Sequence, residues 1–475
     1  MDYETVVGLE VHVELATKTK IFCGCGTGFG AEPNTQVCPV CSGMPGSLPV
    51  FNKEVARFAA LAGLALNCEI NRRNVFDRKN YFYPDLPKAY QISQLYQPIC
   101  RNGFLEIGGG KKIGIHEIHM EEDAGKLLHD PWEDCSNIDY NRCGVPLIEI
   151  VSEPDFRSAG EVVDYLERLR EILLYLGVSD CKMQEGSMRA DINLSVRPSG
   201  AAEFGVRTEM KNMNSFKAIY RAVEFEAKRQ TELIDAGGRV TQETRRWDDN
   251  KEASFSMRSK ENAQDYRYFP DPDLLALDLS EEFIEEIRAN MPESAASKRS
   301  RFTGELGLSA YDAGVLTAEK PLCDLFERTS ALCGNPKEAA NLIIVEICRL
   351  IKEDAATTED ACRRVAPESL AALIKMITGG EINRTVGKDA LAAIFREQAD
   401  PEEYVRERNL LIVNDAGLID EVIDRVLEAN EKSVADFRAG KEKAFGFLVG
   451  QAMKELKGTA NPGAVNGALK KRLGQ

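Results

Sequence analysis

Histidine is scarce in this sequence and long apolar runs are missing, which excludes several classes of protein. The 475 residues include only four histidines. No serine or cysteine has an obvious histidine partner, so no hydrolase or glutaminase triad is predicted. No apolar run approaches the ~18 residues of a membrane span. The chain begins with an acidic segment that leads directly into a predicted strand, so we expect neither a secretory signal nor an Arg-rich transit peptide. We therefore expect a cytoplasmic protein that does not act at a membrane.

The usual phosphate-binding loops are also missing. No segment matches G-x-x-x-x-G-K-[ST], and no G-x-G-x-x-G follows a predicted strand. The run Gly108–Gly110 lies between two predicted strands and is interpreted as a hairpin loop. A bound nucleotide would therefore depend on a cation and on scattered basic side chains. The net charge of −16 argues against a general nucleic-acid binder, but it leaves room for one structured RNA on a local basic surface.

Short strands with ionisable side chains on one face are what the sequence does contain. Successive side chains on one face of a strand lie about 7 Å apart. Segments 6–15, 146–151, 188–197 and 206–211 read as strands of this kind, and their polar positions include Glu10, His12, Glu14, Glu149, Arg189, Asp191, Glu209 and Lys211. A solvated face of an antiparallel sheet would show similar charges. Four such strands together favour a site for a divalent cation and a phosphorylated ligand.

Four of the thirteen cysteines are spaced as a metal site. Two knuckles, Cys23-Gly-Cys25 and Cys38-Pro-Val-Cys41, are separated by twelve residues. Four thiolates bind zinc tetrahedrally and leave no open position, so the sequence predicts a structural zinc site. A disulfide framework is disfavoured in a reducing compartment.

Two further segments carry candidate ligand-binding groups. Three consecutive acids, residues 121–123, follow a predicted strand and would close a Mg²⁺ site with Glu10, His12 and Glu149, although three acids in a row also suit a solvated turn. In residues 78–94, basic side chains such as Lys79 alternate with aromatic ones such as Tyr81. These can stack a base and bind phosphate, although an ordinary aromatic-rich loop has the same composition.

The composition changes twice along the chain. Residues 1–292 are rich in strands and turns, with helices predicted at 160–176 and 215–238, and form a mixed, largely antiparallel α+β domain. Residues 293–405 read as an all-helical domain, and residues 406–475 as a small helical domain. The last 36 residues contain seven Lys or Arg against two Glu, a local basic surface on an acidic chain.

Long blocks of sequence resemble one known family from end to end. The blocks are GLEVHVEL (8–15), RKNYFYPDLPKAYQISQ (78–94), HMEEDAGK (119–126), DYNRCGVPLIEIVSEPD (139–155), EGSMRADINLSVRP (185–198), EMKNMNSF (209–216), QETRRWD (242–248), DYRYFPDPDL (265–274) and FLVGQAMKELKGTANPGAVN (447–466). They resemble the B subunits of tRNA-dependent amidotransferases, the GatB/GatE family. Blocks this long and in this order are specific to that family.

The resemblance implies a fold, an activity and partners. The fold would be a cradle-shaped, largely antiparallel catalytic domain at 1–292 with a zinc knuckle at 23–41, a helical domain at 293–405, and a YqeY-like tRNA-binding tail at 406–475. The activity would be ATP-dependent amidation of misacylated Glu-tRNA(Gln), Asp-tRNA(Asn) or both, by a carbon–nitrogen ligase with glutamine as amido donor. ATP would phosphorylate the side-chain carboxylate, and ammonia would displace phosphate. A separate amidase subunit would supply ammonia through a channel, and a small third subunit would complete a heterotrimer.

The resemblance also assigns roles to residues. The expected Mg²⁺ ligands are His12, Glu122 and Glu149, and the expected zinc ligands are Cys23, Cys25, Cys38 and Cys41, which some family members lack. Catalytic roles are expected for Glu10, Lys79, Asp191 and Glu209, and contacts with ATP for Lys79, Tyr81 and Lys211.

Two other functions remain to be compared with this one. The archaeal-type E subunit carries a large domain inserted before its helical region, and the short stretch after Asp271 leaves no room for one. A non-catalytic tRNA-binding scaffold with a zinc knuckle would not require the set of acidic strand residues.

Overall fold

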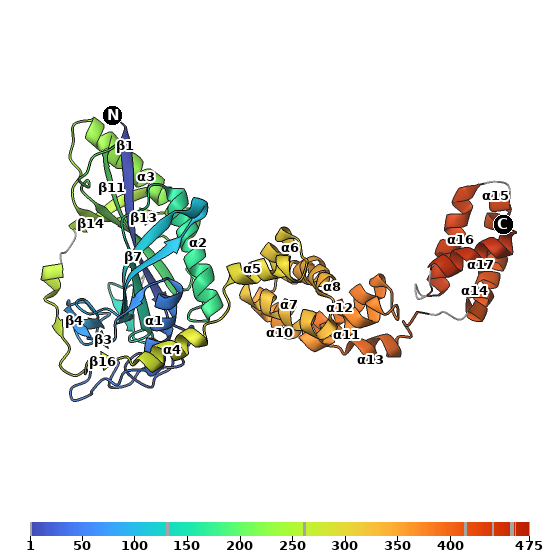
Figure 1. Ribbon diagram of the computed structural model, residues 1–475, viewed down its shortest axis with the longest axis horizontal. Helices are drawn as coiled ribbons and strands as arrows, with labels where there is room; N and C mark the ends of the chain where they lie inside the picture. Colours follow the sequence, from blue (N-terminus) through green and yellow to red (C-terminus); the bar gives the residue numbers. More distant parts are fainter. Residues whose placement is uncertain are drawn as a thin grey trace. The chain divides into compact units, whose positions relative to one another are not determined.

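The computed structural model describes residues 2–129, 133–259, 263–412, 416–438, 441–456, 460 and 462–474. The chain divides into two compact units, Met1–Ser294 and Ala295–Gln475 (Figure 1). This division lies two residues beyond the expected boundary at 292.

A nine-stranded sheet organises the first unit. Its strand order is β14-β13-β12-β11-β1-β10-β7-β6-β2, and the neighbouring strands are antiparallel except for the parallel pair β12 and β13. The strands are β1 (Tyr3–Glu14), β2 (Glu69–Ile70), β6 (Cys100–Glu106), β7 (Lys112–Glu122), β10 (Pro146–Ser152), β11 (Met188–Pro198), β12 (Thr208–Lys211), β13 (Glu243–Asp248) and β14 (Ala253–Ser259). The mixed, antiparallel-rich α+β architecture expected from the sequence is therefore confirmed.

Strand β1 shows why the two faces of this sheet differ. Val7, Leu9, Val11 and Val13 are at most 1% exposed and belong to the main hydrophobic core. The alternate side chains, including His12, point to the opposite, polar face. Three helices cover the core face, namely α1 (Lys53–Ala65), α2 (Ala159–Leu176) and α3 (Phe216–Asp235), and their buried side chains belong to the main hydrophobic core (Figure 1).

Local sequence signals fix the ends of these helices. The Ser158 side chain accepts a hydrogen bond from the Glu161 amide at the start of α2, and Gly177 ends the helix in the left-handed conformation (φ 71°). Ser215 caps α3 in the same way as Ser158 caps α2. Both predicted helices are confirmed.

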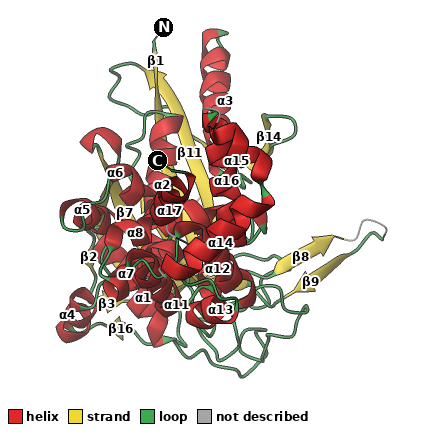
Figure 2. Cartoon of the chain, turned by 90° about the vertical axis from the view of Figure 1, so that its right-hand side faces the viewer, coloured by secondary structure: helices red, strands yellow, loops and turns green. Residues whose placement is uncertain are grey.

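Small sheets and helices complete the first unit. The remaining elements are β3 (Arg73–Asn74), β4 (Asp77–Asn80), β5 (Tyr90–Ser93), η1 (Gly108–Gly110), β8 (Lys126–His129), β9 (Ser136–Asp139), η2 (Ala263–Tyr266), β15 (Phe269–Pro270), β16 (Leu277–Asp278) and α4 (Glu281–Ala289). Strands β8 and β9 pair as an antiparallel hairpin (Figure 2). The sheet β15-β4-β5 is joined to the end of β7, because Gln91 Nε2 donates to the Glu122 carbonyl oxygen at 2.7 Å and the Met120 amide donates to Gln94 Oε1 at 3.0 Å.

The regular elements of the second unit, within its described residues, are all helices. Its helices are α5 (Ala295–Gly304), α6 (Ala310–Leu316), α7 (Lys320–Cys333), α8 (Pro336–Asn341), the π-helical turn η3 (Leu342–Ile347), α9 (Cys348–Glu353), α10 (Thr358–Arg364), α11 (Pro367–Thr378), α12 (Arg384–Glu397), α13 (Pro401–Glu407), α14 (Ala416–Ala429), α15 (Glu431–Arg438), α16 (Glu442–Glu455) and α17 (Pro462–Leu473). Helices α14, α16 and α17 share a separate hydrophobic core. The expected boundary at 405 falls inside α13.

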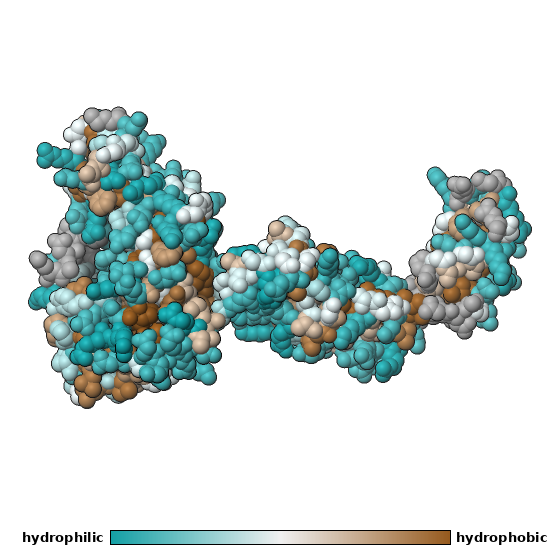
Figure 3. Space-filling model, viewed as in Figure 1, coloured by the Kyte–Doolittle hydropathy of each residue, from teal (hydrophilic) through white to brown (hydrophobic). Residues whose placement is uncertain are grey.

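Both units present mainly hydrophilic residues on the face drawn in Figure 3. Within the described residues, none of the helices combines the length and the apolar character that a membrane crossing requires.

Candidate active site

The first cluster on the polar face consists of His12, Glu149 and Glu121, from three neighbouring strands. His12 on β1 lies opposite Glu149 on β10, and Glu149 lies opposite His119 on β7, two residues before Glu121. His12 Nε2 is 3.8 Å from Glu121 Oε1 and 3.8 Å from Glu149 Oε2. One ligand atom from each side chain lies within 4.8 Å of the others, a spacing that suits a single cation.

Glu122, the expected third ligand, is not in this cluster. Its side chain points to the other face of β7, where Glu122 Oε1 accepts hydrogen bonds from Lys88 Nζ at 2.5 Å and from the Ile92 amide at 3.0 Å. The sequence shows consecutive acids but not the register of β7 against β10, and that register brings Glu121 beside His12. We therefore replace Glu122 by Glu121 in the candidate cation site.

The environment of the cluster alters the protonation of its members. Burial and the positive charges of Arg189, Lys211 and Lys79 lower the pKa of His12 to about 4, although Glu149 opposes the shift. The imidazole is therefore neutral near pH 7 and can coordinate a metal ion. Burial and the neighbouring Glu149 raise the pKa of Glu121 to about 7.

Lys79 lies close to this cluster among aromatic rings. Burial disfavours its charge, but Tyr268, Glu121 and Glu149 outweigh burial and raise its pKa. Its Nζ is 4.9 Å from the centre of the Tyr266 ring and 6.0 Å from that of the Tyr81 ring. The structure therefore brings the predicted pair Lys79 and Tyr81 together. The sequence did not predict that Tyr266 and Tyr268 lie near Lys79. Their segment, residues 265–274, does contain both tyrosines, and this is the sequence signal that could have pointed to them.

A second cluster lies beside the first and consists of Glu10, Asp191 and Glu209. Glu10 on β1 is opposite Asp191 on β11, and one carboxylate oxygen from each of the three residues lies within 4.8 Å of the others. Lys211 Nζ bonds to Asp191 and is 3.3 Å from Glu209 Oε1. The structure thus assembles four residues that the sequence predicted separately. Because Glu10 and His12 are two residues apart on β1, the clusters are about 7 Å apart on one face.

Two arginines and two acids extend the polar face beyond His12. Arg189 on β11 lies opposite His12, and its Nη2 donates to Asp123 Oδ2 at 2.8 Å. Arg142 Nε is 3.6 Å from the same carboxylate oxygen. Burial and the charge of Asp123 raise the pKa of Glu14 to about 8. Of these side chains, Arg189, Arg142 and Glu14 line a cavity of about 740 Å³ next to the first cluster.

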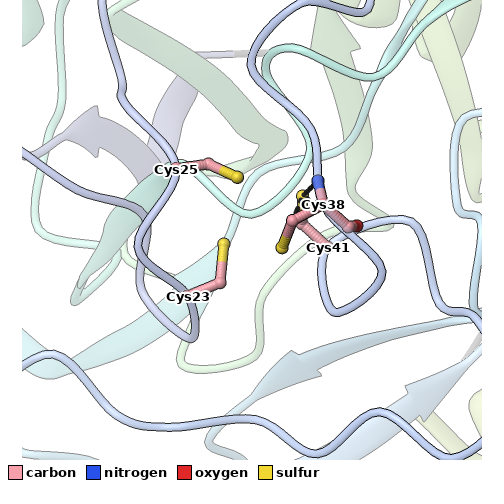
Figure 4. A group of neighbouring side chains, drawn as sticks. All are labelled: Cys23, Cys25, Cys38 and Cys41. Atoms are coloured by element: carbon pink, nitrogen blue, oxygen red, sulfur yellow. Dashed lines mark hydrogen bonds between the residues drawn. The ribbon is translucent and has the colours of Figure 1, made fainter.

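The four cysteines of the predicted knuckle converge (Figure 4). Their sulfur atoms all lie within 4.8 Å of one another, and Cys38 Sγ and Cys41 Sγ are 3.9 Å apart. A Zn–S distance of about 2.3 Å gives S···S separations near 3.8 Å in a tetrahedron, so the site fits zinc. A hydrogen bond from Cys23 lowers the pKa of Cys41 to about 4, and the buried Lys20 Nζ is 3.5 Å from Cys41 Sγ.

The basic segment at the end of the chain is partly described. Six of its seven basic residues lie in the described part, namely Lys441, Lys443, Lys454, Lys470, Lys471 and Arg472, whereas Lys457 lies outside it. Arg472 pairs with Asp424 at 2.7 Å.

Comparisons with known proteins match both units. Residues 5–285 match the model of the GatB/GatE catalytic domain, and residues 324–473 match that of the GatB domain. The B subunit of an aspartyl/glutamyl-tRNA(Asn/Gln) amidotransferase from Lachnoclostridium phytofermentans is 60% identical over 474 residues, 99% of both chains. The B subunit of the enzyme with the same name from Agathobacter rectalis is 57% identical, over 99% of this chain and all of that one. The catalytic-domain model matches more than half of the residues, and the two relatives are this similar along nearly the whole chain. The chain therefore belongs to the GatB/GatE family of amidotransferase B subunits.

Proposed function

We propose that this chain is the kinase and transamidase subunit of a tRNA-dependent amidotransferase in the cytoplasm. It would convert misacylated Glu-tRNA(Gln), Asp-tRNA(Asn) or both into the correctly amidated tRNA, with glutamine as the ultimate nitrogen donor. The observation that carries this proposal is the pair of adjacent clusters on one sheet face, in a chain of this family.

The chemistry requires activation of a carboxylate before nitrogen can enter. A carboxylate oxygen attacks the γ-phosphorus of ATP, the bond from that phosphorus to the β-phosphate oxygen breaks, and ADP leaves. The lone pair of ammonia then attacks the carbonyl carbon of the acyl phosphate, the C–O bond breaks, phosphate leaves and the nitrogen loses a proton. Such steps need charge neutralisation at the transferring phosphoryl group and positioning of both reactants.

The two clusters provide the groups for this neutralisation. His12, Glu121 and Glu149 would hold Mg²⁺, which neutralises phosphate charge when it is bound. Glu10, Asp191 and Glu209 form a second acidic site of the same size. Lys79 and Lys211 lie beside the two clusters and would bind phosphate oxygens, and Tyr81 would flank the nucleotide.

Other parts of the complex would supply ammonia and bind tRNA. This chain shows no glutaminase triad among its described residues, so a separate amidase subunit would deliver ammonia through a channel, and a small third subunit would complete the assembly. The exposed lysines of α16 and α17 would contact tRNA phosphates. Zinc at the four cysteines would support the fold without entering the reaction.

Amide formation on misacylated tRNA tests the proposal. The assembled complex is supplied with ammonium chloride, which bypasses the amidase, and with or without ATP and Mg²⁺. We expect ATP-dependent amidation that falls at least about 100-fold in Glu149→Ala, because the site would lose a ligand of the Mg²⁺ that neutralises the phosphoryl group.

The variants Glu121→Ala and Glu122→Ala separate the two candidate ligands. Loss of Glu121 should raise the Mg²⁺ concentration needed for half-maximal rate, whereas loss of Glu122 should not. A complex that retains full turnover in Glu149→Ala would instead support the non-catalytic tRNA scaffold.

A further inference from the structure

Arg189 is a cationic side chain on the polar face whose hydrogen-bonding capacity is only partly used within the protein. Its Nη2 donates to Asp123, but its buried Nε has no hydrogen-bond partner. Across the described part of the chain, the bond to Asp123 is the one hydrogen bond that its guanidinium makes. Buried donors are almost always satisfied in folded proteins, so one at a site is an indication of a missing acceptor.

The position of Arg189 places this donor group next to the reaction centre. Arg189 lies directly opposite His12 in the β1–β11 pair, and side chains opposite each other on neighbouring strands have Cβ atoms about 5 Å apart. The side chain of Arg189 is 37% exposed and lines the cavity of about 740 Å³. Arg189 and Glu14 line the cavity and are the neighbours of His12 on the polar face, so an acceptor bound at the guanidinium lies beside the first cluster.

The lining of the cavity offers charged groups of both signs and apolar surface to a larger ligand. Besides Arg189, Lys126 and Arg142 contribute basic groups, Glu14, Asp139 and Glu185 contribute carboxyl groups, and Met183 and Met188 contribute apolar surface. The positive charge in this lining is therefore local to the arginines and Lys126. The volume falls within the range of about 300–1,000 Å³ that is typical of ligand pockets, so it can hold an amino acid with part of the nucleotide that carries it.

Arg142 lines the same cavity, but more of its N–H donors are already bonded within the protein than those of Arg189. Its Nε donates to the Ala124 carbonyl oxygen at 2.9 Å and its Nη2 to that of Gly125 at 3.0 Å. Arg142 therefore holds the loop after β7, whereas Arg189 has hydrogen-bonding capacity left for a ligand.

We propose that Arg189 binds the side-chain carboxylate of the tRNA-bound amino acid and positions it beside the first cluster. This inference rests on the proposed function. A guanidinium matches the planar fork of a carboxylate, and such charge-assisted hydrogen bonds are stronger than neutral ones. The amide of the reaction product offers no negative charge, so the same contact favours substrate over product.

Equilibrium binding in the absence of ATP tests the proposal without relying on turnover. The assembled complex is titrated with Glu-tRNA(Gln) and with Gln-tRNA(Gln), which differ only in a carboxylate and its isosteric amide. We expect the wild type to bind the glutamyl form roughly 10- to 100-fold more tightly, and Arg189→Met to lose that preference. Arg197→Met is the matched control, since Arg197 lies on the same strand and bonds Glu4 at 2.6 Å outside this cavity. It should keep the wild-type preference.

Kinetics with ammonium distinguish a carboxylate contact from a phosphate contact. In Arg189→Lys, kcat/KM for misacylated tRNA should fall while KM for ATP stays within about twofold of the wild type, and methylguanidinium should restore part of the rate in Arg189→Met. Arg189→Lys keeps a charge beside Asp123, so it remains informative if Arg189→Met fails to fold.

Three results would overturn the proposal. They are equal affinity of the wild type for the two aminoacyl-tRNAs, a preserved preference in Arg189→Met, and a selective rise in KM for ATP. A complex that prefers the glutamyl form but does not amidate it would refute the proposed function and leave the carboxylate contact in place.

Discussion

At the scale of single residues, Glu226 shows how this domain accommodates a buried charge. Its carboxylate on α3 is fully buried and accepts hydrogen bonds from Arg229, Gln230 and Thr208 at 2.6–3.0 Å. Burial opposes ionisation of this carboxyl group, but the hydrogen bonds outweigh burial and lower its pKa. The network ties the helix to strand β12.

Glu226→Gln should therefore destabilise the protein in a pH-dependent way. The folded pKa lies below the unfolded value of about 4.3, so the ionised group stabilises the fold above that value. The contribution is lost as the pH falls through the folded pKa. Urea unfolding at pH 7 should show a loss of roughly 1–3 kcal/mol, and the difference should shrink below about pH 4. The exposed neighbour Glu224 offers a control, since Glu224→Gln should have little effect. A difference that is constant with pH would mean that packing, rather than charge, is what the variant loses.

Cys41→Ser should abolish tight zinc binding, since it removes one of four converging thiolates. Zinc content after dialysis and competition with a chelator measure the effect. Lys20→Met removes only a partner of Cys41, so its loss should be smaller, about 10- to 100-fold in affinity. The exposed Cys135 is the control, because Cys135→Ser should bind zinc normally. Equal zinc content in the Cys41 and Cys135 variants would contradict a four-cysteine site.

At the scale of elements, helix α2 contains one glycine in its first turn and ends at another. The backbone conformation at the second position requires glycine, whereas that at the first position does not. Gly177 ends the helix at φ 71°, where a side chain is strained, whereas Gly160 in the first turn has an ordinary backbone with room for a methyl group. Gly177→Ala should cost about 1–2 kcal/mol, and Gly160→Ala should be neutral or stabilising by up to about 1 kcal/mol. Thermal unfolding of the two variants measures the difference. Equal melting temperatures would show that the end of α2 tolerates another backbone conformation.

Strands differ in how much of their role the sequence could predict. Alternation in β1 and β11 was enough to place Glu10 and His12 on one face of β1 and Asp191 on one face of β11, because the side-chain period of a strand is two. The choice between Glu121 and Glu122 depends on the register of β7 against β10, which no local pattern encodes. Tyr266 and Tyr268 belong to a segment far along the chain, so only the folded structure shows that they lie around Lys79 beside Tyr81. The four-cysteine site was predictable because its spacing is itself the signal.

At the scale of the whole molecule, the two compact units should fold separately. The core of the first unit is formed by residues before Ser294, and α14, α16 and α17 of the second unit have a core of their own. A fragment of residues 1–294 should therefore unfold cooperatively and bind zinc. Circular dichroism, thermal melting and metal analysis of that fragment test this expectation. A fragment that is unfolded in the presence of zinc would show that the first unit depends on the rest of the chain.

Strand β1 also limits how the length of this chain can change in evolution. It lies at the middle of the sheet, and its apolar side chains pack in the core on one face. On the other face His12 belongs to the first cluster and Glu10 to the second. Insertion or deletion of a single residue between Val6 and Glu14 would exchange the two faces beyond that point, moving carboxylates into the core and valines into the site. Gain or loss of one codon in this segment would therefore disrupt the hydrophobic core and the two clusters at the same time. Changes of length should therefore be tolerated in the connections between strands rather than within β1.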